Sequence, residues 1–301
     1  MTLVIADRRH WPEMLGGYSL TMKRKFSLAH LTVLQWTPPE MIYNAKLIGY
    51  DYVGIRSIYM GLPGEPNYDL SKRDRLYQLT KTALEETGVK IHDIELAKIE
   101  KGRDVLSYEP AFEVAAELGA TDVISSIWTD DKDYYLDQFA RLCDMAKQYG
   151  LFVNLEFVTW AAVKNLKEAK EVINTVKRDN TGYLIDTLHF YRSKVTLSEL
   201  DDIPESKFRM VHICDGPSEI PTNKEDLIFT GREGRYYVGE GAIPIYDIVK
   251  KMGEDVVLSL ELPNLQYVRD YGYTEHARRC LETARRYFEV NDANCHCSHC
   301  N

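Results

Sequence analysis

The most constraining feature of the sequence is a regular alternation of short apolar runs with longer segments of helical period. Eight runs are rich enough in Val, Ile, Leu and Phe to form buried strands. They are residues 25–31, 51–56, 91–99, 120–127, 151–157, 182–188, 208–214 and 256–262. Between them, apolar residues recur every three or four positions, and several of these segments close on Gly or Asn, as helices commonly do.

Strands that alternate with helices form parallel sheets, because each helix carries the chain back to the same edge in a right-handed crossover. Eight such units favour a closed α/β fold, the single-domain (β/α)8 TIM barrel. The alternative is an open doubly wound sheet, but no Gly-rich dinucleotide-binding fingerprint follows an early strand. We expect the barrel over residues 25–290, an N-terminal extension over residues 1–24 and a Cys/His-rich tail over residues 291–301.

The composition excludes some classes of partner. The chain has 301 residues and a formal net charge of −9, so a nucleic-acid backbone would meet net repulsion and we expect no nucleic-acid partner. No apolar run approaches the roughly 18 residues that span a bilayer, so we expect no membrane partner. The N-terminal MTLVIADRRHWPEM has charged residues where a secretory signal needs an apolar stretch, and we expect a cytoplasmic protein.

The six cysteines do not form a disulfide framework, because three are scattered through the body of the chain and three crowd near its end. Cys295, Cys297 and Cys300 occur in CHCSHC, where thiols and imidazoles are dense enough to ligate zinc. The segment is terminal and lacks flanking structure that would hold such ligands together. We therefore interpret it as a flexible tail whose thiols are dispensable for activity.

Polar residues at the ends of the last four strands form the strongest candidate site. The C-terminal ends of all barrel strands converge on one mouth, and these four strands bring Glu156, Asp186, His212 and Glu261 there. Buried carboxylates without a partner are costly, and three together also repel one another. A divalent cation removes both problems, and oxygen ligands with one imidazole suit Mn²⁺, Mg²⁺ or Co²⁺. We predict one divalent cation, with Mn²⁺ as the first choice.

Other polar residues near the predicted mouth have open interpretations. His189 lies three residues beyond Asp186, past the strand and on the loop, where it either belongs to the site or caps the next helix. The first four strands add further candidates for substrate contacts: His30, Arg56, Glu95 and Trp128. Arg56 could anchor a carboxylate or phosphate, and Trp128 could cover the face of a sugar. The ordinary alternatives are that Trp128 covers the core and that Glu95 pairs with Lys98.

The segments VNLEF, GYLIDTLHF, MVHICDG and LSLELP resemble the metal-ligand strands of the xylose-isomerase-like TIM barrels, the sugar-phosphate isomerase/epimerase superfamily that also contains apurinic endonucleases. The likeness extends from FSLAHLTVLQWTPPEMIYNAKLIGYDYVGIR to GEGAIPIYDIVKKM, and so over nearly all of residues 25–290. It implies that the four strand-end residues are metal ligands and that His189, in the D-x-x-H pattern, contacts substrate.

One departure from the resembled family concerns a cation after the seventh strand. In ketose 3-epimerases an Arg follows the strand-seven His at close range, whereas HICDGPSEI contains none. Arg232 or Arg235, in TGREGRYYVGEG, could supply that cation from a longer loop, although Arg residues on a polar loop are more often solvated.

The chemistry that the resemblance implies is proton transfer next to a metal-bound carbonyl, with Glu156 and Glu261 as base and acid on opposite faces of the substrate. We expect an isomerase or epimerase of a small sugar, keto-polyol or sugar phosphate. The alternative is a lyase, either a keto-inositol or dehydroshikimate type of dehydratase or a C-glycoside deglycosidase subunit.

Two other classes of function are disfavoured. A phosphodiesterase of the apurinic-endonuclease type needs several metals and more strand-end His residues than this chain offers. A non-catalytic binding protein would not need a complete ligand set. We leave open a homo-oligomer or a small partner subunit.

Overall fold

The computed structural model describes residues 24–62 and 64–297. Its eight strands pair in sequence order, each parallel to the next, and β8 pairs with β1 to close the barrel. The strands are β1 Phe26–Ala29, β2 Tyr52–Ile55, β3 Lys90–Ile99, β4 Asp122–Ile127, β5 Phe152–Glu156, β6 Thr181–Asp186, β7 Met210–Ile213 and β8 Val257–Leu260. The single-domain (β/α)8 barrel expected from the alternation is confirmed.

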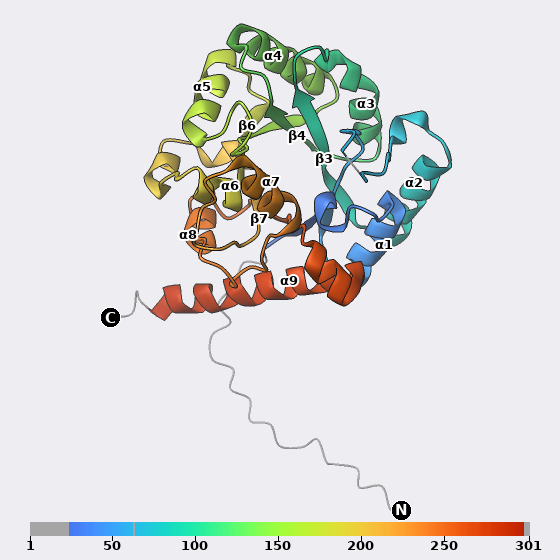
Figure 1. The fold of residues 1–301 in the computed structure, drawn as a ribbon. Helices are drawn as coiled ribbons and strands as arrows, with labels where there is room; N and C mark the ends of the chain where they lie inside the picture. Colours follow the sequence, from blue (N-terminus) through green and yellow to red (C-terminus); the bar gives the residue numbers. More distant parts are fainter. Residues whose placement is uncertain (1–23, 63, 298–301) are drawn as a thin grey trace, which may run out of the picture.

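Helices surround the barrel, as Figure 1 shows. They are α1 Pro38–Ile48, α2 Arg75–Thr87, α3 Glu109–Glu117, α4 Lys132–Gln148, α5 Leu166–Val176, α6 Thr187–Arg192, α7 Lys224–Glu233, α8 Ile245–Lys250 and α9 Leu265–Cys297. Several start where the sequence offers a cap. Thr37 and Glu40 form a reciprocal capping box at α1, and the Asp131 side chain accepts a hydrogen bond from the backbone of α4.

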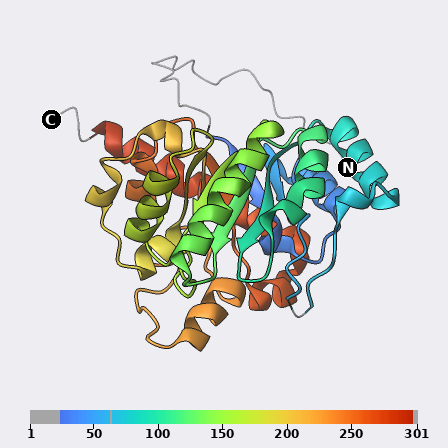
Figure 2. The same ribbon diagram turned by 90° about the horizontal axis from the view of Figure 1, so that it is seen from above.

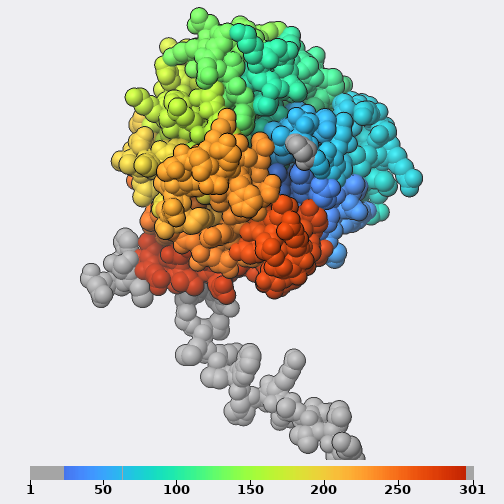
Figure 3. All heavy atoms as spheres, viewed as in Figure 1, coloured from blue at the N-terminus to red at the C-terminus, as the bar shows by residue number. Residues whose placement is uncertain are grey.

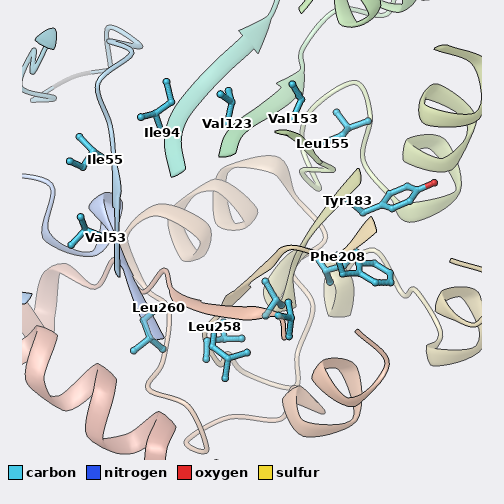
Figure 4. Packing of buried hydrophobic residues seen from close by; sticks show 14 of the residues in the cluster. Val53, Ile55, Ile94, Val123, Val153, Leu155, Tyr183, Phe208, Leu258 and Leu260 are labelled. Atoms are coloured by element: carbon cyan, nitrogen blue, oxygen red, sulfur yellow. The ribbon is translucent and has the colours of Figure 1, made fainter. Parts of the chain in front are cut away.

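Alternation along the strands divides the interior into two apolar layers. Figure 4 shows side chains such as Val153, Leu155 and Leu258 ringing the strands on the side that faces the helices. A smaller cluster of Leu96, Ile124, Leu184, Met210 and Val257 packs separately. Successive side chains of a strand point to opposite faces. Leu184 therefore points to the same side as Asp186, and Met210 to the same side as His212. That side is the barrel interior.

Three short or polar elements differ from the sequence expectation. The strand expected over 182–188 ends at Asp186, because Thr187 already starts α6, so His189 lies on a helix and not on a loop. The loop expected around Arg232 contains α7, whose polar, weakly periodic sequence gives little helical signal. The sixth and eighth helical segments, α6 and α8, have only six residues each, too few for a periodic pattern to stand out.

The C-terminal region continues as helix further than expected. Helix α9 runs to Cys297 with a kink at Gly272, so residues 291–297 are helical and not a flexible tail. An ion pair from Arg24 to Asp292 and a hydrogen bond from Lys250 to the Cys295 sulfur tie these turns to the barrel. Cys300 and the Cys297 side chain, like residues 1–23 of the expected extension, lie outside the described residues.

No helix in the described part of the chain combines the length and apolar character needed to cross a bilayer.

A close backbone approach closes the end of the barrel opposite the mouth. Gly182 in β6 lies against the carbonyl of Lys207, and a Cβ at this position would be 2.1 Å from that oxygen. The Lys207 ammonium in turn donates to the Thr181 carbonyl at 2.7 Å. The contact partner is backbone, which cannot rotate away as a side chain could, so only glycine fits.

We expect Gly182→Ala to lower the free energy of unfolding by about 3 kcal/mol or more, because the added methyl must displace backbone. Gly119→Ala is the matched control: no atom lies within 4 Å of its Cβ position, and only its positive φ of 85° is strained, a cost of about 1 kcal/mol. Urea denaturation of both variants measures the difference. Equal midpoints for the two variants would contradict the close approach.

Candidate metal centre and mouth pocket

The four strand-end residues converge because strand register and alternation agree. Asp186 and His212 are directly paired across β6 and β7, and His212 pairs with Ser259, two residues before Glu261. Glu156 pairs with Leu184, two residues before Asp186. Since residues two apart share a face of a strand, all four side chains point into the barrel at its C-terminal end.

The ligand atoms of these residues form one compact, buried cluster. One oxygen each of Glu156, Asp186 and Glu261 and one His212 nitrogen all lie within 4.8 Å of one another. His212 Nδ1 is 3.3 Å from Glu261 and 3.7 Å from Glu156. Neither ring nitrogen of His212 has a hydrogen-bond partner among the described residues, although the residue is only 1% exposed.

A buried imidazole without hydrogen bonds beside three carboxylates is the donor set of a cation site. Three oxygen ligands and one nitrogen suit a divalent metal, so the chemistry of the cluster fits the predicted cation. This is the one group of three or more such side chains found within residues 24–62 and 64–297. The assignment of each residue as a ligand stays a prediction.

Arg235 joins the cluster from a distant part of the chain. Its guanidinium contacts Asp186 Oδ2 at 2.6 Å through Nη1 and Glu261 Oε2 at 2.9 Å through Nη2. Nε donates to the Gly231 carbonyl at 2.8 Å. Arg235 is only 2% exposed, so it is not the solvated loop residue that is the usual alternative. It holds two predicted ligands in place.

The two glutamates of the cluster differ in proton affinity. Burial raises the pKa of Glu156 to about 7. Burial alone would also raise the pKa of Glu261, but the charges of His212 and Arg235 hold it well below its ordinary value. Two neighbouring carboxylates with separated pKa values are what acid–base chemistry near neutral pH requires.

Asp186 combines the roles of helix cap and cluster member. Its Oδ1 accepts hydrogen bonds from the backbone N–H groups of Leu188 at 2.7 Å and His189 at 3.3 Å, at the start of α6. Its Oδ2 faces Arg235 and the cluster. The cap fixes the direction of the carboxylate, so Asp186 is a helix cap, and its role as a metal ligand stays a prediction.

His189 lies beside the cluster and faces the mouth. Its Nδ1 is 2.8 Å from the Thr159 hydroxyl, and its ring meets Trp160 edge-on with centroids 4.9 Å apart. Burial lowers the pKa of His189 to about 4, so it is neutral at physiological pH. No partner for Nε2 is found among the described residues, and this nitrogen is therefore available to a ligand.

A pocket opens above the cluster with an empty volume of about 510 Å³, including the part open to solvent. This is within the range of small-molecule sites. Many of the residues predicted from the sequence line it: Arg56, Glu95, Trp128, Glu156, His189, Arg232, Arg235 and Glu261. Asp186 and His212 are fully buried and lie outside this lining. Trp128 and Trp160 give the pocket two aromatic walls.

His30 is not part of this pocket. Its Nε2 is 2.8 Å from the Trp36 carbonyl, and its Nδ1 accepts the backbone N–H of Arg56 at 3.0 Å. The ring is completely buried and stacks on Tyr68. With both nitrogens engaged, His30 supports the backbone at Arg56 and has no free atom for a substrate.

The predicted alternative partner of Glu95 is wrong. Lys98 pairs with Glu100 at 2.6 Å and lies over the Trp128 ring, whereas Glu95 pairs with Arg56 at 3.2 Å. The reason is an irregularity of β3 between Ile94 and Ala97, where regular alternation is interrupted and both Glu95 and Leu96 line the pocket.

Helix α7 lies across the mouth and supplies residues that sequence reasoning placed on a loop. Figure 2 shows it, in orange, standing off one end of the barrel, and in Figure 3 the orange atoms cover much of the middle of the visible face. Gly231 packs so closely on Trp160 that a Cβ would be 2.3 Å from the indole ring. Arg232 is half-buried and lines the pocket.

Sequence reasoning missed Trp160, Met60 and Glu65. Trp160 follows the end of β5 as Trp128 follows β4, so the argument used for Trp128 would also have found it. Met60 and Glu65 lie on the long connection after β2, where no periodic pattern indicates which side chains turn inward.

Comparisons with known proteins agree with this geometry. The family model described as xylose isomerase-like TIM barrel matches residues 42–284. The inosose isomerase of Bacillus subtilis is 30% identical over 156 residues, which span 50% of this chain and about half, 52%, of that protein. The inosose isomerase of Bacillus velezensis is 26% identical over 264 residues, spanning 80% of this chain and 87% of the relative.

A solved structure shows the same fold. The IOLI protein, solved with a binding zinc atom, superposes with a TM-score of 0.73 at 23% identity, covering 87% of this chain and 97% of that one. At this level of identity the likeness shows the fold alone.

We expect Asp186→Asn to weaken Mn²⁺ binding at least ~10-fold, since even changes outside the first ligands of a metal cost 10- to 100-fold. His189→Gln is the control, because His189 is adjacent but outside the cluster, and it should bind Mn²⁺ as the wild type does. Calorimetric titration and elemental analysis after dialysis measure both. Full metal content in Asp186→Asn would show that this carboxylate is only a cap and ion-pair partner.

We expect Gly231→Ala to push α7 away from Trp160 and to destabilise the protein by about 1–3 kcal/mol. Gly234→Ala is the control at the end of the same helix, because the nearest atoms to its Cβ position are at an ordinary 3.5 Å. Hydrogen–deuterium exchange should rise over residues 224–235 in the first variant only. Unchanged exchange in Gly231→Ala would contradict the packing of α7 on Trp160.

Proposed function

The chain belongs to the xylose isomerase-like TIM barrel family, and we propose that it is a divalent-metal-dependent isomerase or epimerase of a small sugar, keto-polyol or sugar phosphate. The observation that carries the proposal is the convergence of three carboxylates and a buried imidazole, which makes no hydrogen bond to the described residues, at the floor of a pocket with aromatic walls. Among these substrates a cyclic keto-polyol is favoured, because relatives aligned over most of the chain are named inosose isomerase.

Mn²⁺ is the metal we propose first. Glu156, Asp186 and Glu261 would supply oxygens and His212 one nitrogen, a set that suits Mn²⁺, Mg²⁺ or Co²⁺. When bound, the cation would polarise the carbonyl of the substrate and stabilise negative charge on its oxygen. Zn²⁺ also accepts carboxylate and imidazole ligands, so metal analysis of the purified protein is needed to choose between them.

Glu156 and Glu261 are the groups we propose for proton transfer. They come from β5 and β8, on either side of His212, and both line the pocket. One carboxylate would remove the proton from the carbon next to the carbonyl. The electron pair of the broken C–H bond then stays on the substrate, which becomes an enediolate. Return of a proton to the neighbouring carbon gives the isomer, and return to the opposite face of the same carbon gives the epimer.

The pocket walls would orient the substrate and limit water. Trp128 and Trp160 line the pocket, and their apolar rings would pack against the C–H groups of a sugar or cyclitol. His189 Nε2 would donate to or accept from a hydroxyl or carbonyl oxygen. Helix α7 covers part of the mouth and thereby reduces the access of water to the reacting carbons.

We expect the Mn²⁺-loaded protein to catalyse the incorporation of solvent deuterium into 2-keto-myo-inositol, D-allulose or another member of a ketose panel. Glu156→Gln and Glu261→Gln should lower this exchange by about 10²–10⁴-fold at saturating metal, because an amide cannot accept the proton. Glu205→Gln, at the opposite end of the barrel, is the control and should exchange normally. NMR of recovered substrate measures the rate.

Three outcomes of this assay bear on the reaction class. Deuterium without elimination supports the isomerase or epimerase. Loss of water from the substrate would identify the lyase instead. Normal exchange in both glutamine variants would show that neither carboxylate transfers the proton.

A further inference from the structure

A second polar cluster lies beside the candidate metal centre, formed by Arg56 just after β2, Glu65 on the connection that follows and Glu95 within β3. Arg56, Glu65 and Glu95 are each less than 10% exposed. Arg56 Nη2 contacts Glu95 Oε2 at 3.2 Å, and Arg56 Nη1 lies 3.7 Å from Glu65 Oε1. Three ionisable groups are thus withdrawn from water together, which is costly unless their polar atoms are satisfied.

Each member of this cluster keeps one polar atom unsatisfied. Glu95 Oε1, Arg56 Nε and Glu65 Oε1 are all buried and have no hydrogen-bond partner among the described residues. Buried polar atoms in native proteins are nearly always hydrogen-bonded. Where such an atom belongs to a residue that lines a pocket, a bound molecule can supply the missing hydrogen bond.

Two of the three residues face the same pocket as the metal centre. Arg56 and Glu95 line it together with Glu156 and Glu261. Burial raises the pKa of Glu95, with Arg56 opposing the rise, and the charges of Glu261 and His212 also act on it. A ligand in this pocket would therefore touch the metal centre and the Arg56–Glu95 pair at the same time.

Glu65 acts from behind the pair. It does not line the pocket, and its Oε2 accepts the backbone N–H of Leu62 at 2.9 Å. Glu65 thus connects Arg56 to the long segment after β2, while His30 holds the Arg56 backbone from the other side. The guanidinium of Arg56 is thus held by Glu65 and Glu95, and its backbone by His30, before any ligand binds.

The charge of the cluster argues for hydroxyl groups and against an anion. The cluster has one guanidinium and two carboxylates, and Arg232, which lines the same pocket near Arg56 and Glu65, only balances this charge. The subsite therefore has no excess of positive charge that would attract a phosphate or carboxylate. A hydroxyl both donates and accepts hydrogen bonds. It can donate to the free oxygen of Glu95 and accept from the guanidinium of Arg56 beside it.

We propose that Glu95 and Arg56 form a hydroxyl-binding subsite that selects an uncharged polyol and sets which of its carbons lies at the metal centre. This inference rests on the proposed function in one respect, namely that the substrate carries a carbonyl that reacts at the metal centre. The binding of the hydroxyl does not depend on that function. It narrows the substrate class from sugars and sugar phosphates to uncharged keto-polyols.

The test uses the full-length Mn²⁺-loaded protein with myo-inositol, its mono-deoxy analogues and myo-inositol phosphate as probes. These lack a carbonyl, so binding is measured by calorimetry or ligand-observed NMR without turnover. We expect Glu95→Gln to weaken the binding of myo-inositol about 10-fold, because a hydrogen bond to a charged group is lost. Glu100→Gln, just past the C-terminal end of β3 and paired with Lys98, should bind as the wild type does.

The deoxy analogues identify the hydroxyl without relying on one variant. One deoxy analogue should bind the wild type about 10-fold more weakly than myo-inositol does. Its affinity should fall almost no further in Glu95→Gln, because both changes remove the same hydrogen bond. If Glu95→Gln does not fold, a single analogue that is selectively weakened in the wild type, together with weaker binding of the phosphate, still supports the subsite.

Failure of this inference is distinguishable from failure of the proposed function. The subsite would be overturned by any of three results. These are losses of binding affinity that add for every analogue in Glu95→Gln, tighter binding of myo-inositol phosphate than of myo-inositol, or no binding of myo-inositol by the wild type. Absence of deuterium exchange on the ketose panel, with Glu95-dependent binding retained, would overturn the proposed reaction and leave the subsite in place.

Discussion

Burial of ionised side chains inside a closed barrel is the constraint on which the site depends. Five carboxylates occupy the C-terminal end of the interior: Glu65, Glu95, Glu156, Asp186 and Glu261. Arg56, Arg235 and His212 face them directly. Charges withdrawn from water in this way require compensation by opposite charge and hydrogen bonds. A divalent cation at the floor and hydroxyl groups at the wall would supply what the chain itself lacks.

The two polar clusters that contribute to the pocket are suited to different ligands. The cluster at β5 to β8 has the donor set of a cation site, and the cluster at β2 and β3 has unsatisfied donors and acceptors suited to hydroxyls. Because rigid strands carry both, the distance between them is fixed by the barrel and not by loop conformation. A substrate that spans the two would be held with one carbon at the metal centre, which is how binding geometry sets reaction position.

Helix α7 connects the cover of the pocket to its floor. Gly231 packs on Trp160, and the Gly231 carbonyl accepts a hydrogen bond from Arg235 Nε. Arg235 then reaches Asp186 and Glu261 at the floor. A displacement of the helix would therefore move a guanidinium that holds two predicted ligands, so mouth and metal centre are mechanically linked.

The barrel, the approximate positions of its eight strands and the convergence of Glu156, Asp186, His212 and Glu261 could be predicted from the sequence, because alternation with periods of 2 and 3.6 is a local property and strand ends in a barrel share one mouth. The sequence located Arg56, Glu95 and Trp128 at the mouth for the same reason. The partners of these residues could not be predicted, because they depend on tertiary contacts. Arg235 meets Asp186 across 49 positions of sequence and Arg56 meets Glu95 across 39, and no local pattern encodes such contacts. The engagement of both His30 nitrogens and the crossing of the mouth by α7 likewise depend on packing between distant segments, which becomes defined only once the barrel has closed.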